Sequence, residues 1–416
     1  MRKMKDSGIE WIGTIGENHT LYKVKHIFEI LDQFRSPITA DKRSQDAEIL
    51  YDYYGASGAI DKIDGYTIDD HVMLIGEDGA NLRMRNLPLI YEVRGKAWIN
   101  NHAHILKPKE NMDFKFLMFA LESLDINPYI TGSAQPKLSQ DNLRNMYVSV
   151  PPLPEQQAIS SHLDRQCAHI DNIIEKTKAS IEEYKKLRQA VITQAVTKGV
   201  RGDRPMKDSG IEWIGEIPEE WSVYRIAALY EERNEAGNDE LPILTVSINT
   251  GVSDRELSDD ESARVFVRSE DKSKYMKVCP GDLTYNMMRA WQGAFGAVRV
   301  FGMVSPAYVI AKPKREIDSR YMEALLRTPD AKEEMKRYSY GIADFRLRLY
   351  WDYFKNIKVC FPTLEEQKEI ADYIDAKNAE IDTLITKKEQ FLTELEAYKK
   401  SMIYEYVTGK KEVPSA

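Results

Sequence analysis

The chain has 416 residues, a formal net charge of −8, 43% hydrophobic and 30% charged residues, which is the composition of an ordinary soluble protein with room for two or three domains. No apolar run reaches the ~18–20 residues that a membrane span requires, and the start "MRKMKDSGIEW" has no apolar segment typical of a signal peptide. The three cysteines are scattered and form no CxxC pair. We therefore expect a reduced, cytoplasmic protein without structural disulfides or a zinc site.

Charge is distributed unevenly along the chain. Residues 264–315 hold ten Lys or Arg against three Asp or Glu, whereas residues 231–263 hold ten acidic residues against two Arg. The total charge alone argues against a nucleic-acid partner, but local patches decide what a polyanion meets within a Debye length of ~10 Å. A basic binding patch and the solvated face of an ordinary domain are both compatible with this pattern.

Two internal repeats organise the sequence. The segment "MKDSGIEWIG" occurs at residues 4–13 and again at residues 206–215, and residues 153–199 align without gaps with residues 364–410. Between these ends the similarity is faint but ordered, as in "ILKPK" at 105–109 and "IAKPK" at 310–314. The chain is therefore predicted to be two copies of one unit: a short strap, a variable globular region and a long helix.

The first globular region, about 14–150, is predicted to be mixed α/β. Strands are expected at 71–78, 87–95 and 103–109, where apolar and β-branched residues gather, and a helix is expected near 113–124.

The first long helix is expected over 155–197, because no proline or glycine interrupts this span and Pro154 stands at its start. An apolar stripe follows one face, which implies a partner helix. At 1.5 Å per residue the helix spans ~65 Å.

The second globular region, about 216–360, is again predicted to be mixed α/β. Strands are expected at 241–248, 263–268, 281–288, 295–301 and 307–313, with a helix near 318–327.

The second long helix is predicted to run back along the first as an antiparallel coiled coil. The first helix ends at the linker that leads to the second region, so the second helix begins at the far end and must return. The expected architecture is two α/β (α+β) domains joined by a helix pair with internal pseudo-twofold symmetry, which suits a reader of two separated DNA half-sites. The predicted core of the pair is Ile159, Leu163, Ile170, Ile173, Ile181, Ile370, Ile374, Ile381, Leu384 and Leu392, and the stripe continues through Tyr184, Leu187, Val191, Leu395, Tyr398 and Met402.

Aromatic and basic residues interleave in both globular regions, as in "YNMMRAWQG" and "FRLRLYWDYF". Bases are read by Arg on guanine or by Asn and Gln on adenine, while Lys and Arg hold phosphates. For any single candidate, an ordinary surface or capping role is the alternative. The DNA-binding candidates are Arg83, Arg85, Lys96, Asn100, Asn101, His102, Gln135, Lys137, Asn286, Arg289, Trp291, Gln292, Arg346 and Arg348.

No complete catalytic motif is present in the sequence. There is no GxxxxGK[ST] phosphate loop, "INPYI" at 126–130 lacks the second proline of an amino-methyltransferase motif, and "PDAKEEMK" at 329–336 is too compressed for a nuclease metal site. "NHAH" at 101–104 offers two histidines without a third ligand. We expect neither a catalytic site nor a metal site in this chain.

The sequence resembles the specificity (S) subunit of type I restriction–modification systems. The resemblance rests on the duplicated layout and on "DSGIEWIGEIPEEW" (208–221), "PGDL" (280–283), "VSPAYV" (304–309), "PPLPEQQAI" (151–159), "FPTLEEQKEI" (361–370), "GEDGANL" (76–82) and "NNHAHILKP" (100–108). The first strap departs from the family pattern, since Gly16 and His19 replace the usual proline and tryptophan. This makes the packing of the first strap an open question.

The resemblance implies a non-catalytic protein with two target-recognition domains, 1–150 and 201–360 with its linker, and two conserved helices, 151–200 and 361–416. Each recognition domain would read one half of a bipartite DNA target, and the helices would set the spacing. Two methyltransferase subunits would dock and carry S-adenosylmethionine, and restriction subunits would add ATP and Mg. The alternatives are a divergent fused restriction–methylation enzyme and a coiled-coil adaptor that binds proteins alone.

Overall fold

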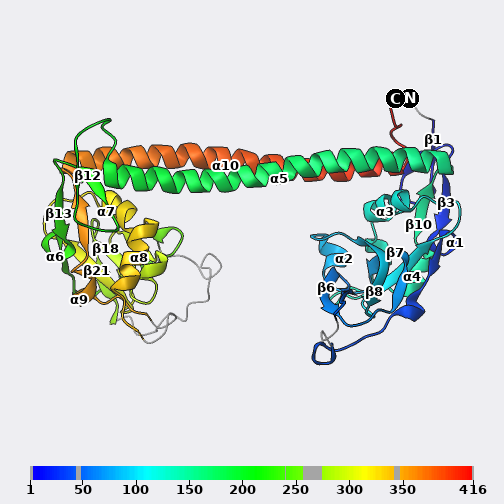
Figure 1. Ribbon diagram of the computed structural model, residues 1–416, viewed down its shortest axis with the longest axis horizontal. Coiled ribbons are helices and arrows are strands. Elements are labelled where there is room, and N and C mark those ends of the chain that lie inside the picture. Colours follow the sequence, from blue (N-terminus) through cyan, green and yellow to red (C-terminus); the bar gives the residue numbers. More distant parts are fainter. Residues whose placement is uncertain (1–2, 44–47, 239, 256–273, 342–346, 415–416) are drawn as a thin grey trace. The chain divides into compact units, whose positions relative to one another are not determined.

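The computed structural model describes residues 3–43, 48–238, 240–255, 274–341 and 347–414. The chain divides into two compact units, each described here by itself. Unit 1 comprises Met1–Thr177 and Glu389–Ala416, and unit 2 comprises Lys178–Lys388, so each unit contains part of both long helices (Figure 1).

Unit 1 is built on a six-stranded sheet in which only the β5–β8 pairing is parallel. Alternate residues of its central strand face opposite sides: Met73 and Ile75 pack toward α3, whereas Val72 and Leu74 join a second apolar cluster. Both faces are thus covered, which explains the continuous apolar run at this position. In sheet order the strands are β4 (Phe28–Ile30), β9 (Ala103–Pro108), β7 (Ile68–Gly76), β8 (Ile90–Ile99), β5 (Tyr51–Gly55) and β6 (Gly58–Ile63).

A separate antiparallel ribbon joins the beginning and the end of this region, because Thr20 of β3 is the partner of Val150 of β10. Short helices complete the unit, and Asp113 caps α3 by accepting a hydrogen bond from the Phe116 backbone. These elements are β3 (Thr20–Lys23), β10 (Tyr147–Val150), α1 (Val24–Ile27), α2 (Asn81–Met84), α3 (Phe114–Ser123) and α4 (Gln140–Asn145).

Unit 2 repeats this plan with a smaller, four-stranded antiparallel sheet. Its ribbon pairs Ser222 with Phe361, as unit 1 pairs Thr20 with Val150. In sheet order the strands are β14 (Tyr230–Glu232), β21 (Tyr308–Pro313), β18 (Leu283–Asn286) and β19 (Phe295–Ala297); the other elements are β13 (Ser222–Arg225), β22 (Lys358–Phe361), β15 (Val246–Ser247), β16 (Gly251–Val252), β17 (Met276–Val278), β20 (Gly302–Val304), α6 (Ile226–Leu229), α7 (Ser319–Leu326), α8 (Pro329–Arg337) and α9 (Trp351–Phe354).

Most predicted elements of the globular regions are confirmed. The strands expected at 71–78, 87–95, 103–109, 281–288, 295–301 and 307–313 and both short helices are present within a few residues. The strand expected at 241–248 is wrong for most of its length: only Val246–Ser247 is strand, since Pro242 has no N–H to donate and Ile243 makes an isolated bridge to Met303. The strand expected at 263–268 lies outside the described residues.

The two straps, residues 4–16 and 206–218, form matching hairpins. In the first, β1 (Met4–Asp6) pairs with β2 (Thr14–Gly16), and in the second β11 (Met206–Asp208) pairs with β12 (Glu216–Pro218) in the same register. Each hairpin contacts the end of a long helix in its own unit. Tyr404 Oη donates to the Ile12 carbonyl at 3.0 Å, and Ile211 and Ile214 join a core that includes Ala195 and Val196. Each strap thus packs on the end of a long helix of its own unit.

The long helices are α5 (Leu153–Lys198) and α10 (Leu364–Val407), and they run antiparallel in both units. In unit 1, the ring centres of His162 and Tyr406 are 4.7 Å apart and Asp171 pairs with Lys399. In unit 2, Tyr184 lies under Lys388 and Arg201 pairs with Glu369. In each unit the residue number falls along one helix as it rises along the other.

The core predicted for the helix pair is largely confirmed. Seven members are buried, namely Ile159, Leu163, Ile170, Ile181, Ile370, Ile374 and Ile381. Ile173, Leu384 and Leu392 are half-buried. Leu187 and Tyr398, predicted to continue the stripe, are exposed. Two successive steps of three lead from Ile181 to Leu187 and from Leu392 to Tyr398, and together they turn each side chain ~120° away from the seam.

Candidate nucleic-acid interface

In unit 1 three loops meet beyond the C-terminal end of β7. The Glu77 N–H donates to the His102 carbonyl at 2.8 Å, and the Leu138 N–H donates to the Glu77 carbonyl at 2.7 Å. These bonds join three segments: the one that follows β7, the one that connects β8 to β9, and the one that precedes α4. They bring together five of the predicted DNA-binding residues, all of them exposed: Arg83, Asn101, His102, Gln135 and Lys137. We call these five residues the loop face of unit 1.

Three other candidates of unit 1 lie elsewhere. Arg85 donates to the Leu124 carbonyl at 3.1 Å and also bonds Glu122, and buried Asn100 accepts a hydrogen bond from the His102 N–H at 2.8 Å. Both side chains are therefore engaged within the fold, which corrects their proposed role in base reading. Lys96 is exposed near the C-terminal end of β8, with its ammonium 4.6 Å from the centre of the Tyr66 ring.

A buried charged network supports the loop face. His104 is completely buried and bridges Asp32 at 2.7 Å and the Leu138 carbonyl at 2.8 Å, while Glu77 contacts Arg35 and Lys137. Burial tends to raise the pKa of Asp32, but the hydrogen bond and charge of His104 outweigh it, so this pKa is lowered. Burial likewise tends to raise the pKa of Glu77, and its contacts with Arg35 and Lys137 lower it. No sequence pattern indicates this network beyond "NHAH", whose two histidines make separate contacts.

In unit 2 the corresponding loops meet at the end of β18. The Met287 N–H donates to the Ala307 carbonyl at 3.1 Å and the Leu349 N–H donates to the Met287 carbonyl at 2.8 Å. This arrangement brings Arg348 beside the segment that carries Arg289 and Gln292.

The remaining candidates of unit 2 have mixed outcomes. Asn286 Oδ1 accepts a hydrogen bond from the Met288 N–H at 2.9 Å and shapes the turn. Trp291 is half-buried against the core of the unit. Arg346 lies outside the described residues.

Exposed aromatic rings surround Arg348. Tyr340 is 70% exposed and stacks on Tyr353 with ring centres 6.3 Å apart and planes at 6°. Tyr350 and Met288 are also exposed. The stretch "FRLRLYWDYF" contains Tyr350 and Tyr353. Tyr340 lies outside this stretch and Met288 was not among the candidates, because no local pattern reveals the exposure of these two side chains.

The two units differ in how their cations are paired. In unit 1, Lys137 lies 3.0 Å from Glu77 and His102 lies 2.7 Å from Asp78. Arg289 and Arg348 of unit 2 have no ion-pair partner among the residues that the structure describes. Unit 2 therefore presents more uncompensated positive charge at this position.

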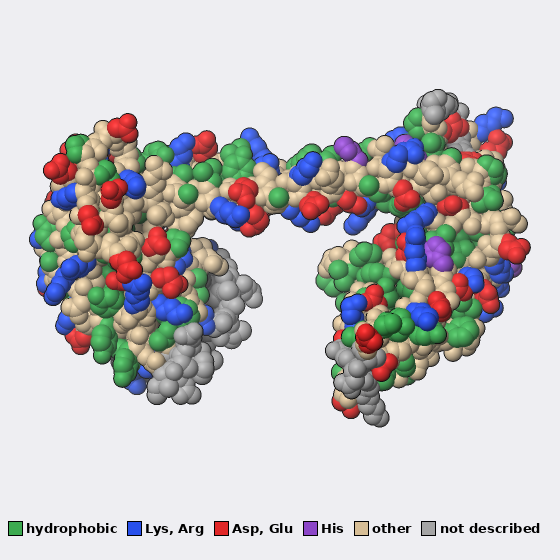
Figure 2. All heavy atoms as spheres, in the orientation of Figure 1, with side chains coloured by type: hydrophobic (Ala, Val, Ile, Leu, Met, Phe, Trp, Pro, Cys, Tyr) green, Lys and Arg blue, Asp and Glu red, His purple; other side chains and the backbone are tan. Residues whose placement is uncertain are grey.

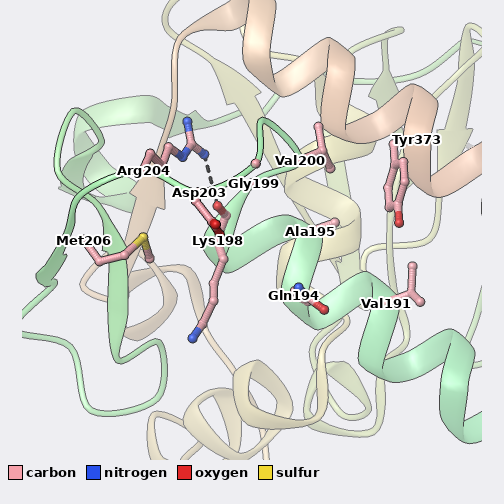
Figure 3. Close-up of a pocket in the computed structure, with 11 residues that line it drawn as sticks. Val191, Gln194, Ala195, Lys198, Gly199, Val200, Asp203, Arg204, Met206 and Tyr373 are labelled. Atoms are coloured by element: carbon pink, nitrogen blue, oxygen red, sulfur yellow. Dashed lines mark hydrogen bonds between the residues drawn. The ribbon is translucent and has the colours of Figure 1, made fainter.

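A further cavity lies where α5 ends in unit 2 (Figure 3). It has a volume of about 440 Å³ and is lined by the last turns of α5, the linker that follows it, and Tyr373 of α10. Arg204 spans its rim and donates to the Lys198 carbonyl at 3.1 Å. Its charged lining residues are Lys198, Asp203 and Arg204, which do not make an acid–base or nucleophilic set.

Side chains of both charges are interspersed along the exposed surface of the helices (Figure 2). No helix in the described part of the chain combines the length and apolarity needed to cross a membrane. Among the same residues, no group of three or more His, Cys, Asp or Glu side chains is arranged to hold a metal ion.

The sequence has recognisable relatives. Residues 17–183 match the family model of the type I restriction modification DNA specificity domain. A putative type I restriction enzyme specificity subunit of Haemophilus influenzae is 25% identical over 325 residues, which cover 78% of this chain and 79% of the relative. The putative MjaX specificity subunit of Methanocaldococcus jannaschii is 24% identical over 442 residues, with 97% and 96% covered.

Two solved structures share the fold at 12% sequence identity. The HsdS subunit from Thermoanaerobacter tengcongensis has a TM-score of 0.54, with 98% of this chain and 100% of that chain covered. A chain from a structure describing complex assembly and conformational transition of the type I R-M system has a TM-score of 0.65, with 95% and 99% covered. Two α/β domains with a pair of long helices are thus an arrangement that solved structures also contain.

Proposed function

We propose, on the premise that the chain belongs to the specificity subunits of type I restriction–modification systems, that it is the DNA-reading and assembly subunit of such a system. Unit 1 reads one half of a bipartite, asymmetric DNA target and unit 2 reads the other half. The chain itself is non-catalytic.

One observation carries this proposal. In each unit the loops at the end of the central strand, β7 in unit 1 and β18 in unit 2, present exposed hydrogen-bond donors. These donors include Lys137 in unit 1 and Arg348 in unit 2. Such donors can reach base edges in the major groove and phosphate oxygens. The surrounding residues differ between the units, as expected for two readers of different sequences.

The helix pair serves assembly and spacing. Two methyltransferase subunits dock on it, and restriction subunits join through the assembled complex. Exposed apolar side chains on the helices, among them Leu187, Phe391 and Tyr398, offer contact area of the kind that protein interfaces use. This assignment is compatible with a net charge of −8, because docked subunits would cover much of the acidic surface.

The chemistry belongs to the partners. S-adenosylmethionine is bound by the methyltransferase subunits, and ATP and Mg by the restriction subunits, all in the cytoplasm. The absence of a phosphate-loop sequence from this chain agrees with that division of labour.

The test is to co-express the chain with the methyltransferase subunit encoded beside it and to map methylated adenines by single-molecule sequencing. We expect one bipartite motif that appears only when this chain is present. Methylation that is unaffected by removal of the chain would refute the proposal.

A further inference from the structure

The two recognition regions share one backbone frame at the edge of their loops. In unit 1, Thr131 and Lys137 exchange two backbone hydrogen bonds of 2.9 and 2.8 Å; in unit 2, Tyr340 and Arg348 exchange two of 2.9 and 3.0 Å. We call each couple a closing pair, because it closes the segment that lies between its members. The residue after each closing pair is a leucine, Leu138 or Leu349, whose N–H bonds the segment following the central strand.

Each closing pair is followed by a buried leucine and carries an exposed cation. Leu138 and Leu349 are completely buried, whereas Lys137 and Arg348 are exposed. A cation thus occupies the same place in each unit, one residue before a buried leucine. The His104 hydrogen bond to the Leu138 carbonyl fixes this place further in unit 1.

The surroundings of the two cations favour a base edge over the phosphate backbone as their target. Glu77 holds the Lys137 ammonium at 3.0 Å, which fixes its position and compensates its charge. Tyr340, the partner of Arg348, presents an exposed ring, and such an apolar side chain can contact a base edge, for example a thymine methyl group, but finds no apolar partner on a phosphate. A shared frame that carries different side chains in two readers is also what a specificity element requires.

We propose that Lys137 and Arg348 are equivalent specificity-determining residues, each donating hydrogen bonds to a guanine edge in its own half-site. This inference rests on the proposed function. Arg348 can bind O6 and N7 of guanine in a bidentate manner, and the Lys137 ammonium can donate to the same acceptors.

The experiment uses the full chain, co-expressed with its methyltransferase subunit, and determines the methylated motif of Lys137→Ala and Arg348→Ala. We expect each substitution to relax one guanine position by at least about tenfold. The two relaxed positions should lie in different halves of the motif, and the other half should be unchanged. Arg348→Lys should relax its position less than Arg348→Ala.

Matched controls come from the equivalent strands β9 and β21. Lys107→Ala and Lys312→Ala remove half-buried cations that pair with Asp70 and Glu231, away from the closing pairs, and both should leave the motif intact. Thermal unfolding of each variant checks that the closing-pair substitutions are no more damaging to the fold than these controls.

Each result has a definite meaning. Unchanged motifs in both closing-pair variants would overturn the inference while leaving the proposed function standing. A uniform loss of methylation over all sites would also overturn it, because that result indicates a phosphate contact. If the unaltered chain directs no motif at all, the proposed function itself fails.

Discussion

Glu92 of β8 shows how single residues stabilise unit 1. Its carboxylate lies 2.8 Å from His71 Nε2, 2.9 Å from Arg94 Nε and 3.0 Å from Lys115 Nζ. Burial tends to raise the pKa of Glu92, but the hydrogen bonds from His71, Lys115 and Arg94 outweigh it and lower the pKa to about 2. A carboxylate with a depressed pKa stabilises the folded state above its unfolded pKa.

We predict that Glu92→Gln lowers the free energy of unfolding at pH 7 by about 1–3 kcal/mol, because three donors lose a charged acceptor. In the unaltered protein this contribution is lost as the pH falls from about 4.5 toward 2, so the variant and the unaltered chain should converge there. Urea denaturation at pH 7 and at pH 3 measures both effects. Glu231→Gln, which removes a more exposed partner of Lys312, should change the stability by less than about 0.5 kcal/mol. An undiminished difference at pH 3 would contradict this account.

At this scale the sequence predicts residue type better than residue role. Gln135 and Lys137 were chosen for their donor groups, and both are exposed in the loop before α4. Arg85 and Asn100 have the same donor chemistry but are turned toward Glu122 and the His102 backbone. Exposure depends on contacts between segments far apart in the chain, and no local pattern contains that information.

At the scale of elements, the residue three positions after each strap contacts a glutamate at the start of a long helix. The buried Trp221 indole donates to Glu366 at 3.0 Å. In the first unit, buried His19 lies with Nε2 3.6 Å from Glu155 and Nδ1 2.9 Å from Ser149 Oγ. Glu155 and Glu366 occupy aligned positions of the two repeats. The unusual His19 therefore keeps the strap-to-helix contact that tryptophan makes in unit 2, which answers the question raised by the first strap.

The C-terminal end of α5 provides a matched pair of glycine substitutions. Gly199 and Gly202 both have positive φ, 74° and 76°, so alanine is strained at either position. A Cβ at Gly199 would also lie 1.9 Å from Arg204 Nη2, whereas a Cβ at Gly202 would meet nothing within 4 Å. Arg204 cannot easily move aside, because it bonds the Lys198 carbonyl (Figure 3) and also pairs with Glu220 and Glu366.

We predict that Gly202→Ala costs about 1 kcal/mol from backbone strain alone and that Gly199→Ala costs at least about 1 kcal/mol more, because it displaces a bonded arginine. Chemical denaturation of the full chain measures both values. Equal costs would mean that Arg204 relaxes freely and that its contacts contribute little.

Elements with strong periodicity were predictable and irregular ones were not. The uninterrupted stripe of α5 and α10 predicted both helices and most of their core. The hairpin of β5 and β6 escaped notice because "YDYYGASGAI" mixes polar and aromatic residues without strict alternation. Residues 241–248 show the opposite error: their apolar run predicted a strand, but it is buried or half-buried and most of it lacks regular strand pairing.

At the scale of the whole molecule, the largest apolar clusters of the two units are separate. The large cluster of unit 2 draws on Ala195, Ile211 and Ile370, and that of unit 1 draws on Val24, Ile170 and Met402; within the described residues no member is shared. The internal repeat predicted this duplication, since two copies of one unit each bury their own apolar face. The difference in size between the two sheets could not be predicted, because the sequences of the two globular regions no longer align.

Because the largest apolar clusters of the two units are separate, each recognition region should be exchangeable. The paired strands of each ribbon mark the positions at which a segment can be replaced. Ser222 is the cross-strand partner of Phe361, so residues 222–361 begin and end side by side. Thr20 and Val150 bound the corresponding segment of unit 1 in the same way. A segment whose ends are neighbours can be replaced without altering the path of the chain outside it.

We predict that replacing residues 222–361 with the aligned segment of another specificity subunit changes one half of the methylated motif and leaves the other half intact. Replacing residues 20–150 should change the opposite half, because each segment carries only its own loops and core. Methylation mapping of the two exchanged chains, co-expressed with the same methyltransferase subunit, measures both outcomes. The control is an exchange that keeps β13 of this chain but takes β22 from the other subunit. The two strands of the ribbon then come from different proteins, and the yield of folded protein should fall. Exchange of either segment that alters both halves would mean that the units do not read DNA independently.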